Sequence, residues 1–180
     1  ATLRPCRWFR SSFRYQLRDD DYSTRFEAQD TVKTGTTSHI YTFDVMLQPS
    51  RDLVTTASFS RQTAVTTTPA SLASSANIPD FHADVNTWLL SADYAPKPNV
   101  SLNGTLQFST AENFNDFTAS GLPFGADFDQ LDVTTGLTWA LPSESSLRTE
   151  YAFYSYLPSS LAAVGDYHAH VIWLEVTKKF

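Results

Sequence analysis

The chain has 180 residues, a formal net charge of −6 and a single cysteine. It is long enough for one domain, its acidic balance gives it no general affinity for nucleic acid, and one cysteine cannot form an internal disulfide. Aromatic residues make up 14% of the chain and charged residues only 18%, whereas soluble domains average about 25% charged residues. No run of about 18 apolar residues is present, which excludes a transmembrane helix but leaves short membrane-spanning strands open.

Eight stretches alternate between apolar and polar residues with the period of a β-strand. The first, residues 8–18, places Phe13 and Tyr15 on one face and Arg10, Arg14 and Arg18 on the other. A buried strand of a soluble protein does not normally carry three arginines on one face, whereas a strand that borders a water-filled interior can. The other strands are predicted at residues 39–48, 53–61, 86–94, 100–108, 131–141, 147–157 and 167–180.

The connections between these strands alternate in length. Long polar loops are predicted at residues 19–35, 66–84 and 109–129, with a shorter loop at 158–166. The turns at 49–51, 95–99 and 142–145 are short, and each contains proline, which stops strand pairing. Short turns at one end and long loops at the other are typical of outer-membrane barrels. A sandwich has no reason to separate its loops by length in this way.

The last fourteen residues also alternate, with Ile172, Leu174, Val176 and Phe180 on one face. This end resembles the closing strand of Gram-negative outer-membrane β-barrels, which end in Phe after alternating apolar residues. Lys178 departs from that pattern. The resemblance implies a porin-like, all-β, antiparallel up-and-down transmembrane β-barrel in the cell outer membrane. Its expected partners are outer-membrane lipid, lipopolysaccharide and the barrel-assembly machinery.

The start of the chain bears on the size of the barrel. Residues 3–8 have the form of the turns at 47–53 and 141–147, with a proline between flanking apolar residues. We therefore predict that Ala1–Leu3 is the tail of an earlier strand and that residues 1–180 are the C-terminal section of a larger barrel. The alternative is a single domain that forms a complete eight-stranded barrel. Side chains fill a barrel of eight strands, whereas about sixteen strands leave an aqueous channel.

The two faces supply the candidate site residues. Arg10, Arg14 and Arg18 form a stripe that favours anionic solutes, unless inward acids such as Asp44 neutralise it. Arg148 and Glu175 are predicted to lie level on neighbouring strands and to form an ion pair. The predicted lumen-lining residues are Arg10, Arg14, Arg18, Asp44, Asp93, Arg148, Glu150 and Glu175. The predicted lipid-facing residues are Phe13, Tyr15, Phe43, Leu90, Leu137, Trp139, Phe153, Leu174 and Phe180.

No pattern predicts catalysis, a metal or a cofactor. His168 and His170 are two residues apart but lack a third ligand at a metal-site spacing. Residues 19–21 are three aspartates without the Gly and Glu of a calcium loop. The sequence contains no G-x-S-x-G, H-E-x-x-H or phosphate-binding motif. We therefore expect a protein that is not an enzyme.

The expected function is a passive pore or scaffold, since no nucleotide motif supplies energy. One variant, implied by resemblance in style, is a sheath around a multihaem cytochrome that serves as an electron conduit. Any haem would then belong to a periplasmic or embedded partner, because the chain has no Cys-x-x-Cys-His. The alternative is a soluble β-barrel or sandwich that binds a small ligand or sugar, with its apolar stripes pointing inward.

Overall fold

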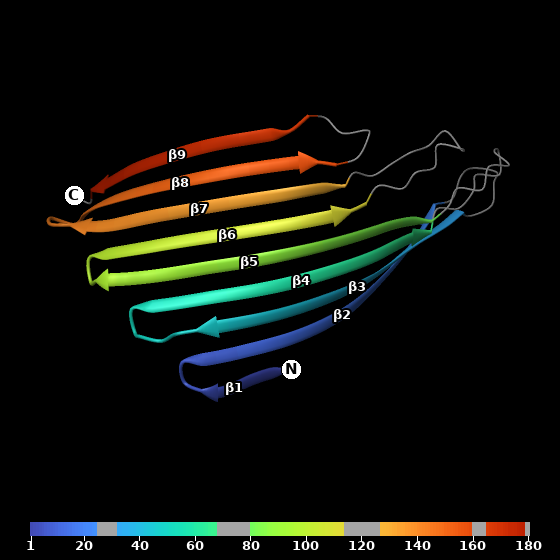
Figure 1. Cartoon of the computed structure of the whole chain (residues 1–180), viewed down its shortest axis with the longest axis horizontal. Coiled ribbons are helices and arrows are strands. Elements are labelled where there is room, and N and C mark those ends of the chain that lie inside the picture. Colours follow the sequence, from blue (N-terminus) through green and yellow to red (C-terminus); the bar gives the residue numbers. More distant parts are fainter. Residues whose placement is uncertain (25–31, 68–79, 114–126, 160–164, 179–180) are drawn as a thin grey trace.

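The computed structural model describes residues 1–24, 32–67, 80–113, 127–159 and 165–178. The strands are β1 (Thr2–Cys6), β2 (Phe9–Thr24), β3 (Val32–Leu47), β4 (Leu53–Thr67), β5 (Phe81–Lys97), β6 (Val100–Glu112), β7 (Phe128–Leu141), β8 (Ser145–Pro158) and β9 (Tyr167–Lys178). Each pairs antiparallel with the next, so the order in the sheet is the order in the chain, as Figure 1 shows. Within the described ranges, no helix is long and apolar enough to cross a membrane.

The all-β, up-and-down arrangement is confirmed, but the predicted number of eight strands is wrong for the described residues, which form nine. The additional strand is β1, which pairs with β2 through Leu3 and Ser11. Residues 2 and 3 therefore belong to an earlier strand, as predicted. The turn comes later than expected, because Pro5 still lies within β1, an edge strand where a missing N–H is tolerated.

The strands are longer than the alternation predicts. The loop predicted at residues 19–35 is wrong for its described part, since Asp19 pairs with Thr37 and Asp21 with Gly35. Residues 25–31 lie outside the described residues. Strands β4, β5, β6 and β7 likewise extend into the loops predicted at 66–84 and 109–129. Backbone pairing needs no apolar side chain, so the ladder continues after the apolar alternation has stopped.

The strands are staggered regularly. One row of directly opposite residues runs through Phe9, Leu47, Thr55, Ala92, Gly104, Thr135, Tyr151 and Ile172. Phe9 is the first residue of β2, whereas Thr55, Gly104 and Tyr151 lie two, four and six residues after the first residues of β4, β6 and β8. The stagger is therefore one residue per strand. With about 3.3 Å per residue and about 4.8 Å between strands, it corresponds to a strand tilt of about 35°, as in closed barrels.

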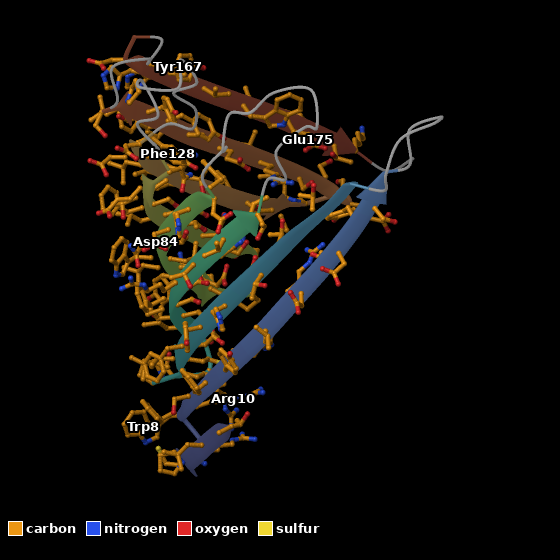
Figure 2. The ribbon with its side chains drawn as sticks, turned by 90° about the vertical axis from the view of Figure 1, so that its right-hand side faces the viewer. Trp8, Arg10, Asp84, Phe128, Tyr167 and Glu175 are labelled. Carbon is orange, nitrogen blue, oxygen red and sulfur yellow. The ribbon has the colours of Figure 1, made fainter. Side chains whose placement is uncertain are left out.

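The sheet curves into an arc, and its two sides differ in chemistry. Figure 2 shows Trp8 on one side of the ribbon and Arg10 on the other, toward which the arc opens. Among the described apolar residues only Ala111 and Ala152 are buried, so this part of the chain encloses no hydrophobic core. The described sheet is also not closed as a barrel, since β1 contacts only β2 and β9 contacts only β8.

Candidate functional site: the two faces of the sheet

The register places all the predicted lumen-lining residues on one face of the sheet. Strand neighbours that lie opposite one another share a face, and the pairs Ser12–Asp44, Asp44–Ser58 and Arg148–Glu175 illustrate the assignment. We call this face the polar face. It carries Arg10, Arg14, Arg18, Asp44, Asp93, Arg148, Glu150 and Glu175.

Asp44 joins three strands on the polar face. Its Oδ2 accepts a hydrogen bond from Ser12 Oγ on β2 at 2.8 Å, and its Oδ1 accepts one from Ser58 Oγ on β4 at 2.7 Å. Both carboxylate oxygens are therefore used by hydroxyl groups. Arg14 also interacts electrostatically with Asp44, the acid predicted to neutralise the arginine stripe. No carboxylate oxygen of the described chain lies within 4.0 Å of the Arg10 or Arg14 guanidinium, so this interaction is not a contact ion pair.

The three arginines differ in their surroundings. Arg18 donates from Nε to Asp20 on the same strand, so the neutralising acid comes from a segment that the sequence pattern assigned to a loop. Arg10 lies opposite Met46 and Arg14 opposite Thr42, neither of which carries a charge. The positive charge of the stripe is thus concentrated on the half of β2 nearest the short turns.

The charged residues of the last hairpin pair differently from the prediction. Arg148 lies directly opposite Glu175, and Tyr156 opposite Tyr167, so the predicted register is confirmed. The predicted ion pair between Arg148 and Glu175 is wrong, because Arg148 Nη2 instead lies 3.1 Å from Glu150 Oε2 on its own strand. Glu175 Oε1 instead accepts from Thr177 Oγ1 at 3.3 Å.

Asp132 on β7 is a polar-face residue that the predicted site omits. It lies opposite Gln107 and Tyr154, and its Oδ2 accepts from Gln130 Nε2 at 2.8 Å. Its Oδ1 is buried and has no hydrogen-bond partner among the described residues. The same period-two alternation that selected Asp44 identifies Asp132, so the signal was present in the sequence.

The opposite face is apolar, and we call it the apolar face. The register places here the predicted lipid-facing residues Phe13, Tyr15, Phe43, Leu90, Leu137, Trp139, Phe153 and Leu174. Phe180 lies outside the described residues. Most of the exposed large apolar side chains belong to this face, and Leu174, for example, is 67% exposed. The apolar side chains therefore do not gather into an interior within the described sheet.

An aromatic row crosses five neighbouring strands of the apolar face. It consists of Phe13, Phe43, Phe59, Trp88 and Phe108, each directly opposite the next. The Trp88 ring centroid lies 5.3 Å from that of Phe59 and 5.6 Å from that of Phe108, within the usual range for favourable ring contacts. The row extends the apolar surface continuously from β2 to β6.

The apolar face also carries polar groups. Tyr15 Oη and His39 Nδ1 share a hydrogen bond of 2.8 Å, and Tyr151 Oη and His170 Nδ1 share one of 2.9 Å. Farther along the strands, Arg61 Nη2 lies 3.5 Å from Asp84 Oδ2. The same face therefore passes from apolar side chains through Tyr–His pairs to charged groups.

The remaining candidate ligands do not form a metal site in the described ranges. His168 and His170 lie on the apolar face, and both rings contact Phe153. Asp19 and Asp21 alternate with Asp20 along β2 and so point to the opposite face from it. No group of three or more potential metal-ligating side chains occurs among the described residues.

The chain was compared with protein-family models, with curated proteins and with solved structures, and no match was found in any of the three comparisons.

Proposed function

We propose that this sheet is part of the wall of an outer-membrane β-barrel. In this proposal the apolar face contacts lipid, the polar face borders an enclosed aqueous space, and the protein acts as a passive pore or scaffold. The single observation that carries the proposal is the apolar face itself, which is continuous over the strands and is not covered by any other part of the described chain.

The height of the apolar face supports a membrane. On β6 it extends from Val100 to Phe108 before Thr110 and Glu112, and on β2 from Phe9 to Leu17 before Asp19. Nine residues at about 3.3 Å each, tilted by about 35°, cover roughly 24 Å along the barrel axis. The lipid-facing band of outer-membrane barrels is about 25 Å tall. The apolar face of a soluble β-sandwich is not limited to the height of a hydrocarbon layer.

The position of the aromatic and ionic groups agrees with this placement. Tyr15 lies two residues before Leu17, the last apolar residue of this face on β2, and Tyr151 lies two residues before Phe153 on β8. Each tyrosine bonds to a histidine on the side of the long loops. Tyrosine favours the membrane interface because its ring is apolar and its hydroxyl is polar. In the Arg61–Asp84 ion pair, Arg61 lies eight residues after the first residue of β4, level with the end of the proposed hydrocarbon region, and Asp84 lies farther toward the long loops.

Depth-dependent quenching tests the proposal on the protein in lipid vesicles. Cys6 is replaced by Ser, and Leu106→Cys or Gln107→Cys is introduced and labelled with an environment-sensitive fluorophore. These neighbours on β6 lie on opposite faces. Brominated lipid chains should quench the label at 106 strongly and that at 107 weakly, whereas aqueous iodide should reach 107 only. Folded protein that stays in buffer without detergent, with neither label quenched by lipid, would favour the soluble ligand-binding alternative.

The polar face can enclose water or a protein partner. For the variant in which it surrounds a multihaem cytochrome, the haem would belong to that partner. The test is to extract the protein from membranes in mild detergent and to stain the purified complex for covalent haem. A stoichiometric haem-containing band would support the sheath. Its absence from an otherwise intact barrel would favour a pore without a haem-containing partner.

A further inference from the structure

A hollow of about 410 Å³ lies between two successive short turns, the one that joins β1 to β2 and the one that joins β3 to β4. It is lined by Arg7 and Trp8 of the first turn and by residues 48–51 of the second. The Gln48 N–H donates to the Trp8 carbonyl oxygen at 2.8 Å. The two sides of the hollow are therefore joined through the backbone.

The hollow carries two positive charges. Arg7 and Arg51 are both exposed, and no acid is among the described residues that line it. No carboxylate oxygen of the described chain lies within 4.0 Å of either guanidinium. The Gln48 amide and the Ser50 hydroxyl line the same hollow and add uncharged hydrogen-bond donors. Because a guanidinium donates in a planar fork that matches the oxygens of a phosphate, this donor set suits a phosphate group.

An aromatic surface adjoins the two cations. Trp8 also lines the hollow, is 52% exposed and lies on the side of the ribbon opposite Arg10, as Figure 2 shows. Its ring centroid lies 6.2 Å from that of Phe9, which pairs directly with Leu47 at the short-turn end of the apolar face. The cations therefore lie next to the end of the apolar face. A ligand that fits both parts has an anionic group attached to hydrocarbon.

The next hollow along the same rim differs in both respects. It measures about 540 Å³, lies at the turn that joins β5 to β6, and is lined by Lys97 and Asp52 among others. One acid thus accompanies one cation, and no aromatic side chain is among the described residues that line it. Ser101 and Thr138, which also line it, belong to the polar face. Two cations beside an aromatic ring are therefore a property of the first hollow and not of the short turns in general.

We propose that the hollow between Arg7 and Arg51 binds the phosphate of an anionic phospholipid, with the acyl chains along Trp8 and Phe9. The inference rests on the proposed function, in which the apolar face contacts hydrocarbon and the short turns lie just beyond it, at the level of the lipid headgroups. Tryptophan favours this interface, and each arginine near an anionic membrane surface adds to the attraction. A zwitterionic lipid fits less well, because its own cation would lie beside two guanidinium groups.

Lipid titration of the intact protein in mild detergent tests this inference. Native mass spectrometry measures the fraction of folded protein that carries phosphatidylglycerol at each lipid concentration. Arg7→Gln and Arg51→Gln should each weaken binding by about fivefold. Lys97→Gln is the matched control, since it removes one positive charge from an exposed residue of the neighbouring hollow, and it should leave binding unchanged. Phosphatidylcholine should bind the unsubstituted protein more weakly than phosphatidylglycerol does.

Other results would overturn the inference. An equal loss in all three variants would show a general attraction between charges, and no loss at Arg7 or Arg51 would place the lipid elsewhere. Equal binding of the two lipids would show that the anionic headgroup is not selected. Displacement of phosphatidylglycerol by an equal concentration of inorganic phosphate would show a site for free phosphate. If brominated lipid quenches the label at residue 106 while both arginine variants bind normally, the membrane proposal stands and the phospholipid site alone is wrong.

Discussion

Arg148 and Glu175 lie directly opposite each other on β8 and β9, yet the Arg148 guanidinium forms its ion pair with Glu150, two residues along its own strand. Glu150 and Glu175 are therefore alternative partners for one cation. Because the Arg148 side chain is 56% exposed, either pairing is worth less than about 1 kcal/mol.

We expect Glu150→Gln to change the free energy of unfolding by less than about 1 kcal/mol, because Arg148 can turn to Glu175. The double variant with Glu175→Gln should cost more than the sum of the two single variants, since no nearby acid then remains. Urea unfolding in detergent micelles, arranged as a double-mutant cycle, measures this coupling. Strict additivity would show that the two carboxylates do not compete for Arg148.

Asp44→Ala should lower the free energy of unfolding by about 1–2 kcal/mol, because the Ser12 and Ser58 hydroxyls both lose their acceptor. Asp93→Ala is the control, since Asp93 is an exposed acid on the same face and should change stability by less than about 0.5 kcal/mol. Unfolding in urea, followed by tryptophan fluorescence, distinguishes the two. Equal effects would mean that the Asp44 hydrogen bonds do not hold β2, β3 and β4 together.

Leu90→Arg should impair folding into lipid vesicles, while Ser91→Arg should be tolerated. Leu90 lies on the apolar face between Trp88 and Ala92, and Ser91 lies on the polar face between Thr56 and Thr105. An arginine in the middle of the lipid-facing band costs about 2–4 kcal/mol. Equilibrium folding in vesicles over a urea series gives both values. Tolerance of arginine at residue 90 would place that residue outside the hydrocarbon.

Arg14→Gln should reduce anion preference more than Arg18→Gln, if the polar face borders a conducting pore. Arg18 is already paired with Asp20, whereas Arg14 lies opposite Thr42 and has no described carboxylate within ion-pair distance. The reversal potential of the intact protein in a planar bilayer under a salt gradient measures the preference. A larger effect of Arg18→Gln would place the selective region nearer the long loops.

The strand faces were predictable from the sequence because the period-two pattern is set by each strand alone. Phe13 and Arg14, or Leu90 and Ser91, differ so strongly in polarity that the faces follow from their order. The strand register that places Arg148 opposite Glu175 was also predictable, since the loop at 158–166 is short enough to restrict it.

Strand ends and side-chain partners were not predictable in the same way. Residues 19–24 are polar on both faces, so nothing in their alternation indicates a strand, although the backbone ladder with β3 continues through them. The choice of Glu150 over Glu175 depends on rotamers of long side chains, which sequence spacing does not specify. The three-residue tail at the start was too short to define β1 by periodicity.

The antiparallel order of β1 to β9 has a consequence for how such a wall can vary between proteins. Inserting or deleting one strand would reverse the direction of every strand after it, so that the later short turns would lie on the side of the long loops. Inserting a whole hairpin, such as β5–β6 with its proline-containing turn, leaves both outer edges as they were. Circumference should therefore change in steps of two strands, each step adding roughly 12 Å of perimeter at this tilt.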